Sequence, residues 1–191
     1  MTTPPFPLWQ AEAADATFSD PATCARRAST FERTIRVRNI FEYGAAAFVT
    51  VLFGAASIAA FSKGEWLFGS STMVVLIGVA VVVRNLLKRG SNIDRRSEDP
   101  CLVHLKRQYE RQHEFLRNVP LLYLGPLVPG IAMFYGVVAF RVAQVSSWAI
   151  TLEGLAGPIA ITVALFGFIA LANWLAARSL ARKIEEIDAL A

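Results

Sequence analysis

The side chains with the chemistry of metal ligands gather in one stretch, which holds Cys101, His104, His113 and Glu114. Cys101 and His104 would share one face of a helix, because residues three apart lie on the same side. A zinc site needs further Cys or His ligands at a recognised spacing, and His113 lies more than two helical turns beyond His104. We therefore expect two solvated histidines on a basic helix, and no metal or other cofactor.

Enzyme signatures are missing as well, since the sequence contains no Gly-rich phosphate loop, no G-x-S-x-G and no H-E-x-x-H. The apolar runs described below also lack ionisable residues in their interiors, where an ion-coupled transporter would need them. Glu42, Arg141 and Glu153 lie at the ends of these runs and are expected to anchor helices at the lipid headgroups. The sequence thus predicts a protein that is not an enzyme.

Basic side chains are the remaining candidates for a binding role. In two segments they interleave with apolar residues at helical spacing. Such basic amphipathic helices bind anionic lipid headgroups or protein partners. Nucleic acid is not an expected partner, because the basic residues gather where a membrane protein retains them. The candidate lipid or partner contacts are Trp9, Arg26, Arg27, Arg33, Arg36, Lys106, Arg107 and Arg111.

Hydrophobic residues make up 54% of this 191-residue chain, and the mean hydropathy is +0.44. Soluble domains average about 45 to 50% apolar residues. Four apolar runs are long enough to cross a hydrocarbon layer of about 30 Å. These runs are 40–61, 66–83, 119–142 and 155–177. The sequence therefore predicts an all-α polytopic membrane protein with four transmembrane helices as two hairpins, each preceded by a basic amphipathic helix.

These elements divide the chain into six segments. They are a flexible tail at 1–19, an amphipathic helix at 20–39, a first transmembrane hairpin at 40–83, a loop with an amphipathic helix at 84–118, a second transmembrane hairpin at 119–177 and a C-terminal helix at 178–191. The second hairpin is expected to turn through residues 143–154.

The distribution of charge predicts the orientation. Of the 19 basic residues, 17 fall on one side of the arrangement, and only Lys63 and Arg141 fall on the other. Because Lys and Arg are retained in the cytoplasm, we expect both termini to be cytoplasmic. Cys24 and Cys101 would then lie in a reducing compartment, and we expect them to remain separate thiols.

The third apolar run carries an unusual group of helix-weakening residues, and we expect a kink at Pro126, Pro129 and Gly130. A structural kink is the favoured interpretation, because neighbouring helices satisfy the freed backbone groups. The alternative is a broken helix that lines a substrate site in a small transporter or permeability factor.

An Asp-Pro-x16-Arg-Asn pattern begins at Asp20 and again at Asp99, an offset of 79 residues. Each copy leads into an apolar run. We infer an internal duplication of one unit, an amphipathic helix followed by a transmembrane hairpin. The sequence leaves open whether the amphipathic helices bundle together or lie flat on the headgroups.

The run FERTIRVRNIFEY, from Phe31 to Tyr43, with Leu8-Trp9-Gln10 upstream, resembles an uncharacterised group of small proteobacterial multi-span membrane proteins. Members of that group carry a Trp-Gln tail and an Arg-rich helix ending in Arg-Asn-x-x-Glu-Tyr, and some look like neighbours of alternative sigma factors. The resemblance implies a bacterial inner membrane and favours a regulatory partner, with no activity to transfer.

These expectations together predict a non-enzymatic integral membrane protein that binds or regulates through its basic cytoplasmic helices and tail. Its expected partners are anionic membrane lipids, a cytoplasmic protein or a second copy of the chain.

Overall fold

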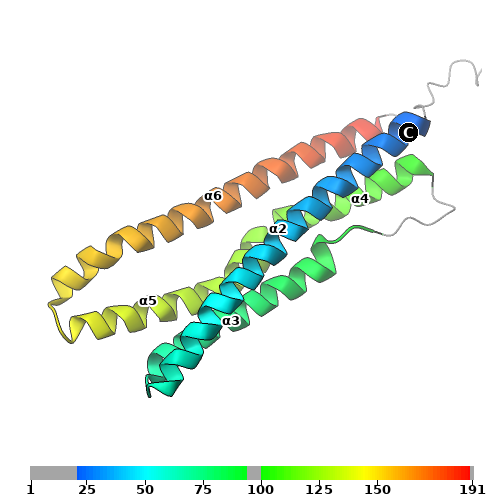
Figure 1. Cartoon of the computed structure of the whole chain (residues 1–191). Coiled ribbons are helices and arrows are strands. Elements are labelled where there is room, and N and C mark those ends of the chain that lie inside the picture. Colours follow the sequence, from blue (N-terminus) through cyan, green and yellow to red (C-terminus); the bar gives the residue numbers. More distant parts are fainter. Residues whose placement is uncertain (1–20, 94–99, 190–191) are drawn as a thin grey trace, which may run out of the picture.

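The computed structural model describes residues 21–93 and 100–189 of the chain. Within these ranges every regular element is a helix, and the helices run side by side as an elongated bundle (Figure 1). Four of them are long and apolar enough to cross a membrane. The predicted all-α, polytopic membrane architecture is therefore confirmed. The predicted tail at 1–19 lies outside the described residues.

The first hairpin consists of α2 (Pro21–Ser62) and α3 (Trp66–Asn85). Its turn places Gly64 at a φ of 75°, a left-handed conformation that a glycine adopts without steric cost. Helix α2 has 42 residues and is about 63 Å long, roughly twice the thickness of a hydrocarbon layer. The amphipathic helix expected at 20–39 and the first span are thus one continuous helix.

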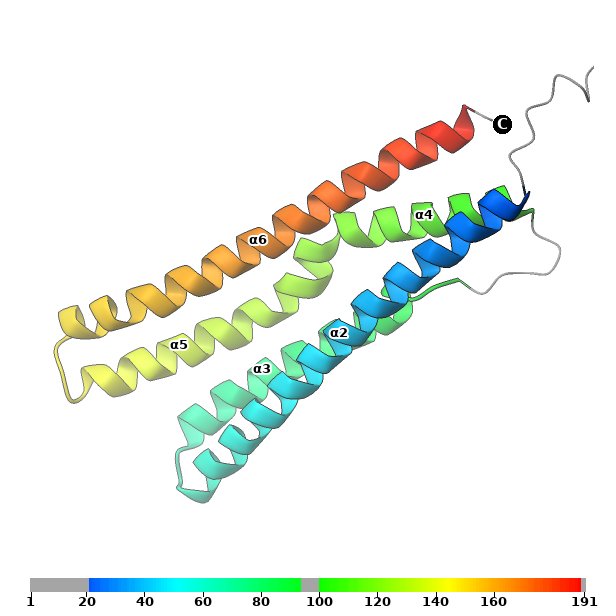
Figure 2. The same cartoon turned by 45° about the horizontal axis from the view of Figure 1, so that its top comes forward.

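The chain between the two hairpins changes direction twice. Helix α3 continues into a π-helical turn, η1. Helix α4 begins after the loop that follows η1. Beyond Asn118, which caps α4, the helix gives way to a second π-helical turn, η2, and a short 3-10 turn, η3, before α5. Figure 2 shows the resulting bend between α4 and α5. The bounds are η1 Leu86–Gly90, α4 Cys101–Arg117, η2 Pro120–Leu124, η3 Gly125–Leu127 and α5 Val128–Ala143.

The last helix, α6 (Trp148–Asp188), runs the whole length of the molecule. It begins with Ser147 as N-cap, whose side chain accepts a hydrogen bond from the backbone N–H of Ile150. The turn expected through residues 143–154 is present but shorter, because α5 ends at Ala143 and helix begins again at Trp148 and continues past Pro158. The fourth span and the C-terminal helix predicted at 178–191 are likewise one element as far as Asp188.

In the apolar half of the bundle, α3 is the most enclosed of the four long helices and contacts both α2 and α5. A Cβ on Gly78 would lie 2.5 Å from the carbonyl oxygen of Pro126, and one on Gly130 would lie 2.8 Å from the Val75 backbone. These two glycines therefore let α3 and α5 approach closely. Buried hydroxyls of Ser57 and Thr72, 2.6 Å apart, join α2 to α3.

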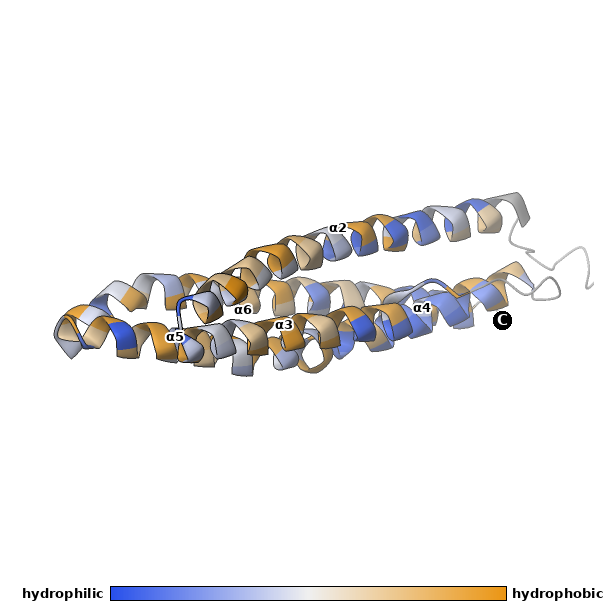
Figure 3. Cartoon of the chain, turned by 60° about the horizontal axis from the view of Figure 1, so that its bottom comes forward, coloured by the Kyte–Doolittle hydropathy of each residue, from blue (hydrophilic) through white to orange (hydrophobic). Residues whose placement is uncertain are grey.

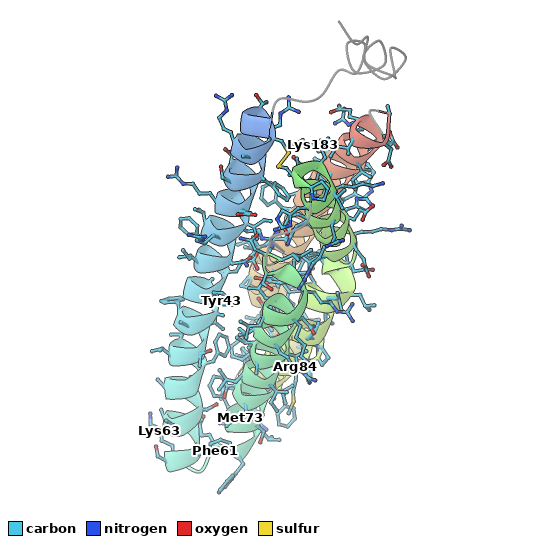
Figure 4. The ribbon with its side chains drawn as sticks, turned by 90° about the vertical axis from the view of Figure 1, so that its right-hand side faces the viewer. Tyr43, Phe61, Lys63, Met73, Arg84 and Lys183 are labelled. Atoms are coloured by element: carbon cyan, nitrogen blue, oxygen red, sulfur yellow. A yellow bond between two sulfur atoms is a disulfide. The ribbon has the colours of Figure 1, made fainter. Side chains whose placement is uncertain are left out.

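The polar half of the bundle is called the basic head below. It comprises residues 21–39 of α2, residues 86–93, α4 and residues 178–188 of α6. Figure 3 shows hydrophilic residues gathered on α4 and on the N-terminal part of α2. Lys63 and Lys183 mark opposite ends of the molecule, and Lys183 lies at the end that carries the disulfide described below (Figure 4).

Candidate functional site

The basic head has an apolar core of its own, to which α2, α4 and α6 all contribute. Ala28, Leu105, Tyr109 and Leu180 are among its buried members. The rings of Phe31 and Tyr109 meet edge to face with centroids 4.6 Å apart, and aromatic pairs of this geometry attract each other. The amphipathic helices therefore bundle together, each using its apolar face to cover the others.

The first turns of α2 and α4 are joined by a disulfide between Cys24 and Cys101, whose Cα atoms are 6.3 Å apart. The expectation that the two cysteines remain separate thiols is contradicted by this bond. That expectation rested on the predicted compartment, whereas the bond depends on the packing of two helices that are far apart in the sequence.

A layer of buried polar groups lies beside this core, on the face of α4 that carries His104 and Gln108. His104 is only 2% exposed, and its Nε2 lies 3.2 Å from Glu32 Oε1 on α2. Gln108 donates to the side-chain oxygen of Asn92 and accepts from the Ile93 backbone, which fixes the segment after η1. The prediction of solvated histidines is wrong for His104. His113 is partly buried, and its Nδ1 lies 2.9 Å from the Ala177 carbonyl oxygen on α6.

Several side chains of this layer donate to the same acceptor, the Gly90 carbonyl oxygen. It accepts hydrogen bonds from Arg38 Nη2 at 3.2 Å, Asn39 Nδ2 at 3.1 Å and Gln112 Nε2 at 3.3 Å. Arg38 also pairs with Glu42 one turn along the helix, at 3.5 Å. Three side chains from two helices thus hold the end of η1 where the chain leaves the apolar layer.

The Arg-Asn pairs of the proposed duplication have different surroundings. Asn39 is buried inside the continuous α2 and bonds to Gly90, whereas Asn118 ends α4 and donates to Glu114 of its own helix. Pro100 is the N-cap of α4, and Asp20 and Asp99 lie outside the described residues. The duplication stays a prediction.

A groove of about 1030 Å³ opens between α2, α4 and α6 at the tip of the basic head. Its apolar lining includes Phe31, Leu105 and Tyr109, and its cations are Arg26, Arg27 and Lys183. The Lys183 ammonium lies 5.7 Å from the centre of the Tyr109 ring. The remaining lining residues are Thr23, Cys24, Thr30, Thr34, Leu102, Glu186 and Ile187. The groove suits a ligand that is both apolar and negatively charged.

The surroundings of the groove shift the pKa values of nearby ionisable groups. Burial raises the pKa of the Tyr109 phenol, Arg27 opposes that rise and Glu186 adds to it. On the outer face of α4, the Lys106 ammonium has a raised pKa because it donates a hydrogen bond to Asp188. Both groups therefore keep their neutral-pH forms, the phenol uncharged and the ammonium charged.

Of the basic residues predicted as contacts, only Arg26 and Arg27 are brought together in the groove. Arg33 and Arg36 are exposed on α2 away from the groove lining, and Lys106 pairs with Glu110 at 3.8 Å as well as with Asp188. The others lie along α4, and Trp9 lies outside the described residues. Sequence reasoning missed Lys183, Phe31 and Tyr109, although their apolar-basic pattern placed each of them on an amphipathic helix.

The predicted kink residues lie in two different environments. Pro126 belongs to the 3-10 turn η3, whereas Pro129 and Gly130 lie in the first turn of α5, where a proline is readily accommodated. The bend itself begins earlier, at Asn118 and Pro120, because a proline has no N–H to continue the α-helical bonding.

Among the described residues, no group of three His, Cys, Asp or Glu side chains is close enough to hold a metal ion. Comparison with models of protein families, with curated proteins and with solved structures gives no match for this chain. Its function is therefore argued from its own geometry.

Proposed function

We propose that this chain is a non-enzymatic binding component of a bacterial inner membrane, with its basic head in the cytoplasm. The groove between α2, α4 and α6 would hold an acidic, apolar segment of a protein partner. The observation that supports this most directly is the combination of an apolar floor with three cations, Arg26, Arg27 and Lys183, in one groove.

The distance between the groove and the predicted membrane boundary favours a protein ligand over a lipid ligand. Arg27 precedes the predicted membrane boundary at Ile40 by thirteen residues of uninterrupted helix, which amounts to about 20 Å along the helix axis. Electrostatic attraction is screened over about 8 Å at physiological ionic strength. Headgroup phosphates therefore lie beyond the reach of Arg26 and Arg27 when α2 stands upright.

The chain itself contains a segment of the composition that the groove suits. Residues 1–19 include Glu12 and Asp15, no Lys or Arg, and the apolar side chains of Phe6, Leu8 and Trp9. This segment precedes α2, whose first turns line the groove. In the proposed function, residues 1–19 compete with the partner for the groove. This competition would regulate partner binding.

A labelled peptide of residues 1–19, added to the purified full-length protein and followed by fluorescence anisotropy, tests the proposal. Deleting residues 1–19 from the protein is expected to strengthen peptide binding, because the groove becomes free. Replacing the three groove cations by Gln is expected to weaken binding about tenfold, since an exposed charge pair typically contributes about 0.5 kcal/mol.

The matched control is Arg33→Gln with Arg36→Gln, which removes two cations from α2 outside the groove. Equal loss of binding in the control and groove variants would indicate a general charge effect and would count against the proposal. If the groove substitutions left peptide binding unchanged, the groove would not be the binding surface.

A small transporter is the second candidate, and the interruption of the third span over residues 118–127 favours it. Broken helices can line substrate sites in transporters. The close packing of Gly78 against Pro126, however, gives this stretch a structural role. Substrate-dependent flux in proteoliposomes, lost on replacement of Pro126 and Pro129, would support transport over binding.

A further inference from the structure

A second pocket, of about 350 Å³, lies on the other side of α4, lower in the molecule than the groove. It is bounded by the end of η1, by α4 and by the start of η2. Its lining combines three cations with one carboxylate and two apolar side chains. The lining residues are Lys88, Arg89, Arg111, Glu114, Phe115, Asn118 and Leu122.

This pocket lies at the level where the chain passes between the polar and apolar halves. Leu122 belongs to the predicted third span, and its carbonyl oxygen accepts a hydrogen bond of 2.7 Å from Asn85 Nδ2 at the end of α3. Both π-helical turns line the pocket, η1 through Lys88 and Arg89 and η2 through Leu122. Such turns are frequent at functional sites.

The cations of the pocket are available for a ligand. Arg111 Nη2 donates to the Lys88 carbonyl oxygen at 2.9 Å, which holds α4 against η1. The side chains of Lys88 and Arg89 are exposed, and neither pairs with a carboxylate in the described part of the chain. Glu114 is the single acidic group in the lining, so the cations outnumber it by three to one.

We propose that this pocket binds the phosphate of an anionic phospholipid in the adjacent leaflet. Lys88, Arg89 and Arg111 surround the phosphate, while Leu122 contacts the glycerol and the first carbons of the acyl chains. Basic pockets at the ends of transmembrane helices bind anionic headgroups in this way. The proposal is independent of the groove, because it uses other residues at another level.

Native mass spectrometry of the intact protein in detergent, titrated with phosphatidylglycerol, measures the binding. Each cation near a lipid surface contributes about fivefold to affinity, so replacing all three by Gln is expected to weaken binding about a hundredfold. Glu114→Gln is expected to strengthen it, because a like charge is removed. The control, Lys106→Gln with Arg107→Gln, removes two cations of the same helix about 16 to 18 Å above Asn118 and keeps wild-type affinity, and circular dichroism checks that each variant is helical.

Two further titrations identify the source of the phosphate. Phosphatidylcholine, which carries a compensating positive charge, is expected to bind more weakly than phosphatidylglycerol. Inorganic phosphate is expected not to displace the lipid at equal concentration, and displacement would replace the lipid proposal with a soluble anion. The proposal is also overturned if the triple variant and Glu114→Gln both bind phosphatidylglycerol like the wild type.

Discussion

At the scale of single residues, the disulfide between Cys24 and Cys101 lies at the edge of the head groove, since Cys24 is one of its lining residues. The bond ties the first turns of α2 and α4, which form two walls of the groove. In a reducing cytoplasm, where the proposed function places the head, the two cysteines would lie side by side as thiols, and the bond would form when this end of the molecule is oxidised. Their proximity is set by the packing of the head, and the compartment determines their oxidation state.

We expect this pairing to be visible in labelling of the purified protein. After oxidation with diamide, a maleimide added in denaturing detergent should label neither cysteine until a reductant is supplied. The Cys24→Ser variant should label at Cys101 without reductant, because its partner is gone. Two labelled thiols in the oxidised wild-type protein would show that the cysteines do not meet.

The buried polar layer shows why some residues were misread from the sequence. The helical pattern of α4 identifies its apolar face but says nothing about which helix covers the rest. His104 is buried because Glu32, seventy-two positions earlier, faces it across the head. A contact of this kind follows from tertiary packing and leaves no signal in local spacing.

At the scale of the elements, the spans were predictable because lipid requires long uninterrupted apolar runs, and all four lie within helices. Helix ends were harder to predict, as α6 shows by continuing through Pro158. The bend before α5 begins near Pro120, upstream of the predicted Pro126 and Pro129. Packing against a neighbouring helix determines at which proline a helix bends. A single sequence does not reveal which helix is the neighbour.

The contact between α3 and α5 gives a prediction at this scale. Gly130→Ala is expected to destabilise the protein by about 1 to 3 kcal/mol, because the added methyl group meets the Val75 backbone at 2.8 Å. Gly136→Ala in the same helix is the matched control, since nothing lies within 4 Å of its Cβ position. Thermal unfolding in detergent measures both, and equal midpoints would contradict the described packing.

At the scale of the whole molecule, the proposed function requires the basic head to stand upright from the membrane. The continuous α2 lifts the groove away from the lipid, while the lower pocket stays near the headgroups. If the first half of α2 lay flat instead, its arginines would contact lipid and the groove would open against the membrane. The groove therefore requires an upright α2, whereas no described residue of α2 lines the lower pocket.

Depth-dependent fluorescence quenching in liposomes tests this most directly. Ser29→Cys and Phe41→Cys, each in a Cys24→Ser, Cys101→Ser background, place a fluorophore at two exposed positions of α2 that are about 18 Å apart along its axis. A quencher attached to lipid headgroups should quench the fluorophore at position 41 strongly and leave position 29 nearly unquenched. Equal quenching at both positions would mean that α2 lies along the membrane surface, and the upright head would be contradicted.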